Sequence, residues 1–245
     1  MRVQFPLAYT ATGQKLQALL APVQSDKIVM WAQRAHSPNH IGITRTYNKV
    51  EQLQRFRAAG LNTPDYTTNR ELATAHLIGG RRVIGRTLYG TQGKGIQSPG
   101  RLWRLHWLGQ YRQPRNIRRA WSRSEWFSIL ENDPYTEYRF HIVNGKSVMR
   151  MQKTHTFPTL QGPLPIRNRK NGWTFIRDCT IPTEDLRETA KKAVEALGYP
   201  WGAVDLLYNT NTGRIVVLEV NSAPGMDDRT TTVYSQEIAK LVQGL

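Results

Sequence analysis

Apolar positions spaced like the turns of a helix predict three helices. The first covers Asn48–Ala59, where Asn48 provides an N-cap and Gly60 a stop. Its apolar positions are Val50, Leu53, Phe56 and Ala59. The same spacing predicts helices over Asp185–Leu197 and Ala11–Ala21. With the strand-like segment Lys27–Trp31, the last of these predicts a small α/β layer near the N-terminus.

Two pairs of alternating segments predict β-hairpins. Glu137–Val143 and Ser147–Lys153 flank an Asn-Gly dipeptide, whose tolerance of positive φ favours a tight hairpin turn. Further along, Ala203–Tyr208 and Arg214–Asn221 flank the turn sequence NTNTG. The chain therefore combines helices with antiparallel strands.

The second hairpin concentrates metal-binding side chains on one face. Strand alternation places Glu219 and Asn221 together, and a turn near Asn211 or Thr212 places Asp205 opposite Glu219. The remaining positions face a core: Val204, Leu206, Leu218 and Val220. Two carboxylates and an amide oxygen are ligands that Mg²⁺ accepts beside nucleotide phosphates. The alternative is a solvated polar face on an ordinary hairpin.

A glycine-rich run, Gly90–Gly95, follows the strand-like segment Arg81–Arg86. Small residues let backbone N–H groups approach an anion, so the run can cradle phosphate. A flexible turn between two strands explains it equally well. It does not match a Walker A loop, because no Ser or Thr follows Lys94, and it does not match GxGxxG, because Ser98 stands where the third glycine would be.

The first hairpin carries a second charged face. A two-residue turn pairs Arg139 with Arg150, beside Glu137 and His141. Facing arginines lose stability unless an anion lies between them, or unless both extend into water. Glu137 can orient one guanidinium. His141 is expected to be structural rather than a general base.

Composition indicates a soluble globular protein of 245 residues with 39% hydrophobic content. No segment reaches the roughly 18 apolar residues of a membrane span, and the N-terminus lacks the apolar run of a signal peptide. A single cysteine, Cys179, fits a reducing compartment and is interpreted as a small buried side chain rather than a nucleophile. We therefore expect a cytoplasmic protein without a membrane partner.

The net charge of +16 indicates an anionic partner. No acidic residue occurs between Leu72 and Ser124. Within that stretch, Arg101–Arg123 interleaves arginines with Trp103, Trp107, Tyr111 and Trp121. Such a surface can stack on bases and hold phosphates, which predicts nucleic acid or an acidic peptide as partner. A half-buried strand pair with its basic residues in water is the alternative.

The segments LEVNSAPG, EYRFHIVNGK and RTLYGTQGKGI make residues 45 to 245 resemble the ATP-grasp superfamily. The resemblance is strongest to the RimK-like proteins encoded by tailed bacteriophages, which would place the protein in the host cytoplasm. It implies an α+β fold in which two subdomains clasp ATP. The implied organisation is a reduced α/β region over residues 1–68 and an ATP-grasp domain over 69–245, divided into a small lobe (69–132) and a large lobe (133–245).

The resemblance also assigns roles to single residues. Nucleotide contacts are implied for Lys49, Arg86, Gly90, Gly93, Lys94, Gly95 and Glu137, and the adenine-reading hinge for Ser128, Ile129, Leu130 and Glu131. Residues close to the transferred phosphate are implied to be Arg139, Arg167 and Asn168. The metal ligands are Asp205, Glu219 and Asn221, which agrees with the geometric prediction. Arg86 stands where a lysine is commoner.

The implied activity is an ATP-dependent ligase that joins a carboxylate to an amine through an acyl phosphate. ATP and two Mg²⁺ ions, for which Mn²⁺ can substitute, are the implied cofactors. The acid and amine are expected to be an amino acid or peptide and an acceptor of polyanionic character. The alternative function is a nucleic-acid-binding protein that keeps the fold with little or no turnover.

Overall fold

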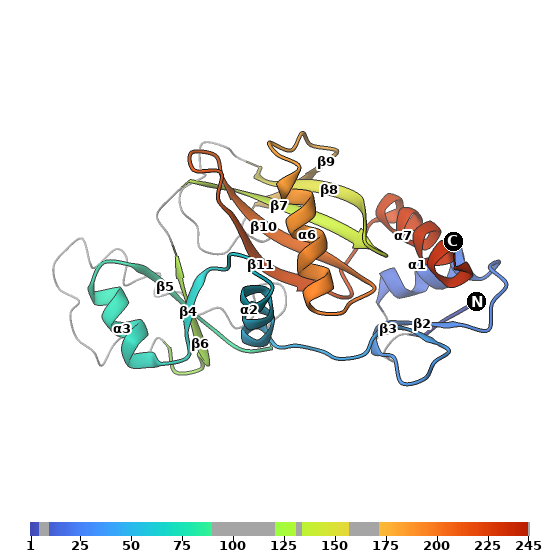
Figure 1. The fold of residues 1–245 in the computed structure, drawn as a ribbon, viewed down its shortest axis with the longest axis horizontal. Helices are drawn as coiled ribbons and strands as arrows, with labels where there is room; N and C mark the ends of the chain where they lie inside the picture. Colours follow the sequence, from blue (N-terminus) through green and yellow to red (C-terminus); the bar gives the residue numbers. More distant parts are fainter. Residues whose placement is uncertain (5–9, 90–120, 131–133, 157–171, 245) are drawn as a thin grey trace.

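The computed structural model describes residues 1–4, 10–89, 121–130, 134–156 and 172–244. Its elements form an elongated molecule with three sheets, one at each end and one in the centre (Figure 1). No helix in these ranges is long and apolar enough to cross a lipid bilayer.

The N-terminal layer is a parallel three-stranded sheet in the order β1 (Arg2–Gln4), β2 (Ile28–Arg34) and β3 (His40–Ile43). Helix α1 (Ala11–Leu20) packs beside it, so the α/β layer is confirmed. The layer also receives α7 (Asp228–Gln243), which packs against α1. The two ends of the described chain therefore meet in one layer (Figure 1).

At the opposite end lies an antiparallel sheet in the order β4, β6, β5. Its strands are β4 (Asp65–Thr67), β5 (Arg82–Arg86) and β6 (Trp126–Leu130), with α3 (Arg70–Ile78) packed against it. Strand β4 lies before the boundary expected at residue 68, yet it pairs with β6. This sheet therefore contains residues from both sides of that boundary.

The central sheet has five antiparallel strands in the order β11, β10, β7, β8, β9. The strands are β7 (Tyr135–Val143), β8 (Lys146–His155), β9 (Trp173–Arg177), β10 (Trp201–Asn209) and β11 (Ile215–Asn221). Both predicted hairpins are confirmed. Asn144 and Gly145 have φ values of 48° and 70°, as their turn requires.

Two helices cover one face of this sheet, α2 (Lys49–Ala58) and α6 (Asp185–Ala196). Asn48 caps α2, and Glu51 bonds back to the Asn48 N–H, so the predicted helix start is confirmed. The buried side chains of α2, α6 and the sheet form one core. Cys179 lies in this core, as expected, and burial is the main cause that raises the pKa of its thiol.

Two β-bulges change the predicted registers. A bulge between His141 and Ile142 places Met151 opposite Arg139 and Phe140 opposite Arg150, so the predicted Arg139–Arg150 pair is wrong. A second irregularity follows Asp205, after which Val217 lies opposite Leu206. Val217, rather than Leu218, therefore enters the core.

Candidate active site

The face of the central sheet opposite α2 and α6 carries a row of charged side chains from adjacent strands. Glu219, Asp205 and Arg139 are direct neighbours across β11, β10 and β7. Their strand neighbours Val220, Val204 and Phe140 point to the other face and are buried in the core. Alternation that fills the core on one side thus gathers the charges on the other. The predicted register of Asp205 and Glu219 is confirmed.

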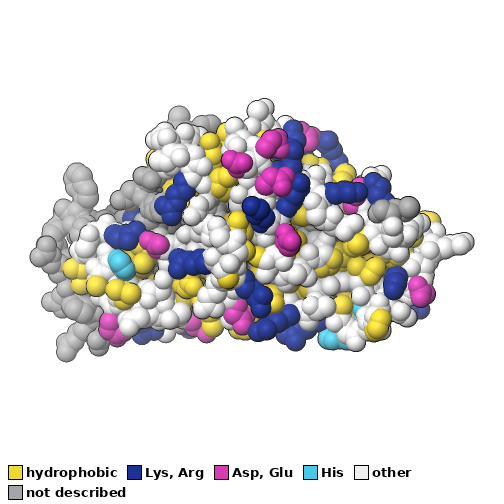
Figure 2. All heavy atoms as spheres, in the orientation of Figure 1, with side chains coloured by type: hydrophobic (Ala, Val, Ile, Leu, Met, Phe, Trp, Pro, Cys, Tyr) yellow, Lys and Arg dark blue, Asp and Glu magenta, His cyan; other side chains and the backbone are white. Residues whose placement is uncertain are grey.

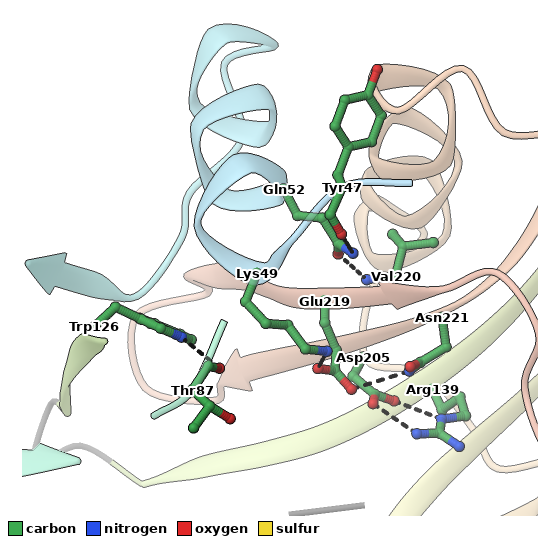
Figure 3. Close-up of polar contacts among 10 residues, drawn as sticks. All are labelled: Tyr47, Lys49, Gln52, Thr87, Trp126, Arg139, Asp205, Glu219, Val220 and Asn221. Atoms are coloured by element: carbon green, nitrogen blue, oxygen red, sulfur yellow. Dashed lines mark hydrogen bonds and ion pairs between the residues drawn. The ribbon is translucent and has the colours of Figure 1, made fainter. Parts of the chain in front are cut away.

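Asp205 and Arg139 form a two-pronged ion pair. Arg139 Nε lies 2.6 Å from Asp205 Oδ1, and Arg139 Nη2 lies 2.7 Å from Asp205 Oδ2 (Figure 3). Burial opposes the charge of Asp205, but Arg139 outweighs it and holds the pKa of this carboxyl below its usual value. The same pairing raises the pKa of Arg139 against the effect of burial. Both groups are therefore charged at neutral pH.

Glu219 is held by Lys49 and Asn221 (Figure 3). Lys49 Nζ donates to Glu219 Oε2, and Asn221 Nδ2 donates to Glu219 Oε1 at 3.1 Å. Burial opposes the charge of Glu219, yet Lys49 keeps its pKa below the usual value despite the neighbouring Asp205. Two carboxylates on adjacent strands are thus each neutralised by a cation from another element.

Gln52 fixes the helix that supplies Lys49. Its Oε1 accepts from the buried backbone N–H of Val220 at 3.0 Å, and its Nε2 donates to the carbonyl of Tyr47 at 3.4 Å (Figure 3). Val220 lies between Glu219 and Asn221, so the side chain of Gln52 links the start of α2 to the strand that carries both residues. Sequence reasoning missed Gln52, although its place on the buried face of α2 was a usable signal.

Arg86 ends β5 and lies near the carboxylates of Glu219 and Glu137, whose charges raise its pKa against a larger lowering by burial. Its buried Nε has no hydrogen-bond acceptor among the described residues. By contrast, Lys49, Arg139 and Lys153 each have a carboxylate partner. Arg86 is therefore a partly buried cation with unused donors, which suits an anionic ligand.

Lys153 and Phe175 complete the charged face. Lys153 Nζ lies 2.5 Å from Glu137 Oε1, so this lysine is a partner of Glu137. The ring of Phe175 covers both cations, 4.6 Å from Arg139 Cζ and 5.4 Å from Lys153 Nζ. Neither Lys153 nor Phe175 was identified from the sequence, because the chain around Phe175 offers no periodic pattern.

His141 is a structural residue, as expected. Its ring Nδ1 lies 3.0 Å from the hydroxyl of Tyr234, and both side chains are buried. Burial, aided by Arg139, lowers the pKa of His141 to about 3. The imidazole is therefore neutral and enclosed.

Of the hinge residues, Ser128 and Ile129 lie inside β6, the middle strand of its sheet. Each pairs with both neighbouring strands, whereas Leu130 pairs only with Arg82. Backbone groups for an adenine ring are therefore more accessible at the end of β6. Several predicted site residues lie outside the described residues: Gly90, Gly93, Lys94, Gly95, Glu131, Arg167 and Asn168. The same holds for residues 101–120 of the basic stretch.

The proposed ligands of a metal ion are hard oxygen donors. No three His, Cys, Asp or Glu side chains gather in the described part of the chain, so the set depends on the Asn221 amide oxygen as third donor. Asp205 and Glu219 face each other in register, which brings their Cβ atoms to about 4.5 to 5.5 Å. This donor set fits Mg²⁺ bound together with nucleotide phosphates.

No protein-family profile matches the chain. Among curated proteins, it is similar to a probable alpha-L-glutamate ligase of Maridesulfovibrio salexigens, with 26% identity over 205 residues, 79% of this chain. The chain spans 62% of the length of that relative, and 34% and 59% of two other ligases that it matches.

Solved structures show the fold. A D-alanine–D-alanine ligase from Bacillus anthracis aligns with a TM-score of 0.60 at 12% identity, covering 99% of this chain and 97% of that protein. The ATP-grasp ligase PsnB, complexed with minimal precursor, Mg and ADP, aligns with a TM-score of 0.56 at 15% identity, covering 81% of this chain and 58% of that one. The chain has the ATP-grasp fold, with mixed helix and sheet content as predicted.

Proposed function

We propose that this protein is an ATP-dependent carboxylate–amine ligase that works through an acyl phosphate. The observation that carries the proposal is the row of Glu219, Asp205 and Arg139 on one face of the central sheet. Lys49 of α2 reaches Glu219, and Arg86 of β5, whose Nε has no acceptor among the described residues, lies near the same carboxylate. The likeness to proteins named as a probable alpha-L-glutamate ligase, a D-alanine–D-alanine ligase and an ATP-grasp ligase supports the same reaction class.

The nucleotide is bound mainly through its phosphates. Arg86 offers unused N–H donors in a fixed fork, and Lys49 can move from Glu219 to a phosphate oxygen. The run Gly90–Gly95 supplies backbone N–H groups for the terminal phosphates. Asp205, Glu219 and Asn221 would hold Mg²⁺, which neutralises charge on the β- and γ-phosphates.

The side chains position the reactants. A carboxylate oxygen of the acid attacks the γ-phosphorus, the bond to the β,γ-bridging oxygen breaks, and ADP leaves. The amine then attacks the acyl carbon, loses a proton and expels inorganic phosphate. Asp205 accepts hydrogen bonds from Arg139 Nε and Nη2. The third guanidinium nitrogen, Nη1, makes no hydrogen bond among the described residues. Together with Arg167 and Asn168, Nη1 can stabilise the tetrahedral oxyanion.

The finer assignments follow from the sequence. We propose an amino acid or peptide as one substrate and an amine-bearing, polyanionic acceptor as the other, since the net charge is +16. A RimK-like ligase encoded by a tailed bacteriophage and working in the host cytoplasm remains our prediction. A nucleic-acid-binding protein without turnover is the second candidate, favoured by the arginine and tryptophan run of residues 101–123.

The test measures ADP from Mg-ATP against a panel of amino acids, peptides and oligonucleotides, with hydroxylamine added to trap an acyl phosphate. We expect ADP formation that depends on a carboxylate substrate and is lost in Glu219→Ala. The control is Glu188→Ala, because Glu188 lies exposed on α6. Normal turnover in Glu219→Ala with unchanged magnesium dependence would refute the metal assignment. Binding of oligonucleotides without any ADP would favour the second candidate.

A further inference from the structure

Trp126 is the first residue of β6 and lies directly opposite Arg86, the last residue of β5. The Arg86 guanidinium carbon is 5.3 Å from the centre of the Trp126 ring, within the range of a cation–π contact. The indole Nε1 donates to the carbonyl of Thr87 at 3.1 Å (Figure 3). One side chain thus holds both the cation and the backbone that follows it.

The indole is itself firmly placed. It is buried in the main core beside α2 and α6, and the ring of Tyr66 meets it edge-on at 6.4 Å. The next turn of the chain is fixed too, since Leu88 N–H donates to Glu125 Oε2 at 2.8 Å and the Leu88 carbonyl accepts from Lys49 N–H at 3.4 Å. The chain just before the glycine-rich run is therefore bonded to the residue preceding β6 and to the start of α2.

The kind of contact matters for binding. A carboxylate that holds an arginine uses the guanidinium N–H donors, as Asp205 does with Arg139. An aromatic face attracts the cation through its π-electrons and leaves those donors free. Arg86 is held in the second way, and its Nε has no acceptor within the described ranges.

We propose that Trp126 is a positioning residue that holds Arg86 ready for the nucleotide phosphates without occupying its hydrogen-bond donors. The proposal rests on the nucleotide site proposed above. It assigns Trp126 an effect on the phosphates alone, because the ring's contacts described above are with Arg86, Thr87 and Tyr66, none of which is a predicted hinge residue. A structural role would instead change the binding of nucleoside and nucleotide together.

The experiment compares equilibrium affinities for ATP and adenosine in the wild type, Trp126→Leu and Trp126→Phe. We expect Trp126→Leu to weaken ATP binding about tenfold, as the loss of a desolvated cation–π contact implies, and to leave adenosine affinity within about twofold. Trp126→Phe keeps an aromatic face and should recover most of the loss. Trp121→Phe is the matched control, because Trp121 is buried against the same sheet and packs on Phe127.

A double-mutant cycle with Arg86→Gln completes the test. If Trp126 acts through Arg86, Trp126→Leu changes ATP affinity little once Arg86 is replaced. An equal loss in both backgrounds, or equal weakening of ATP and adenosine, overturns the proposal. If the wild type binds ATP no better than adenosine, the proposed nucleotide site itself is wrong. If the wild type prefers ATP to adenosine and Trp126→Leu keeps that preference, only the role of Trp126 is wrong.

Discussion

Two carboxylates lie side by side on a poorly hydrated sheet face, and their negative charges are neutralised by neighbouring basic side chains. Lys49 neutralises Glu219 and Arg139 neutralises Asp205. The side chains of Asp205 and Glu219 are 7% and 26% exposed, so neither charge is well solvated by water. A divalent cation that enters this face must therefore compete with Lys49.

Replacing Lys49 by methionine should strengthen metal binding in nucleotide-free protein. The change removes the competing ammonium and leaves Glu219 without its cation, so we expect Mn²⁺ affinity to rise about tenfold, the equivalent of about 1.4 kcal/mol. Calorimetric titration with Mn²⁺ measures this directly. Lys191→Met is the control, since Lys191 pairs with exposed Glu188 on α6. Equal Mn²⁺ affinity in wild type and Lys49→Met would argue against a metal site at Glu219.

His141 should make folding stability depend on pH. The unfolded chain binds a proton at His141 below its ordinary pKa of about 6.5, whereas the folded protein resists protonation down to about pH 3. The unfolded state therefore binds more protons in this window, and stability falls as the pH decreases. The contribution of His141 is at most about 1.4 kcal/mol per pH unit.

Urea unfolding between pH 7.5 and 4.5 tests this dependence. We expect His141→Asn to lower stability at pH 7, where the Tyr234 hydroxyl loses its partner, but to give a shallower decline toward acid. Identical slopes in the two proteins would show that His141 is not the group responsible.

Among the elements, β10 carries a glycine, Gly202, at a position where a larger residue would clash with a side chain of β11. A Cβ at Gly202 would lie 2.5 Å from Val220 Cγ1, and its next neighbour, Val194 Cγ2, would be 3.5 Å away. The conflict is with one methyl group. Val220 stands between Glu219 and Asn221, so a shift of its backbone would move both predicted ligands.

Gly202→Ala should destabilise the protein by about 1 to 3 kcal/mol, the range for overpacked cores. In a Val220→Ala background the same change should cost much less, because the obstructing methyl group is gone. Denaturant unfolding of the four proteins in this cycle gives the coupling. Gly225→Ala, which meets nothing within 4 Å, serves as the reference. Additive effects would contradict the steric explanation.

The same elements show what sequence patterns can predict. Alternation and turn chemistry predicted both hairpins and the facing of Asp205 and Glu219, because these are properties of adjacent residues. The bulges were not predicted, because an extra residue in a strand leaves no local sequence signal. One of them separated Arg139 from Arg150. The Lys49–Glu219 contact joins residues 170 positions apart, so only the three-dimensional fold could reveal it.

At the scale of the whole molecule, charge is spread unevenly. Figure 2 shows Lys and Arg interspersed with Asp and Glu over the central region that contains α6, where Arg187 pairs with Glu184 and Lys191 with Glu188. Local pairs of this kind leave little net charge. Of the net charge of +16, +11 comes from the acid-free stretch of residues 72–124.

Binding to single-stranded nucleic acid should therefore weaken steeply with salt. Each neutralised phosphate contributes a slope of about 0.7 on a logarithmic plot. Replacing Arg115, Arg118 and Arg119 together should flatten the slope and spare ATP affinity. Fluorescence anisotropy with a labelled oligonucleotide at several salt concentrations measures both proteins. If the wild type shows no salt-sensitive binding to oligonucleotides or acidic peptides at low ionic strength, the excess charge serves solubility.

The packing of α7 against the N-terminal layer also bears on how the chain folds while it is being synthesised. Trp31 stacks on Trp201 at 5.9 Å and meets Tyr234 of α7 edge-on at 6.1 Å, in a cluster that also buries Leu16 and Leu20. Helix α7 follows every other described element, so these early apolar residues leave the ribosome long before their partners exist. Until α7 is synthesised, the apolar surface of the nascent N-terminal layer is uncovered. Chains with such exposed apolar surface are bound by chaperones and aggregate readily.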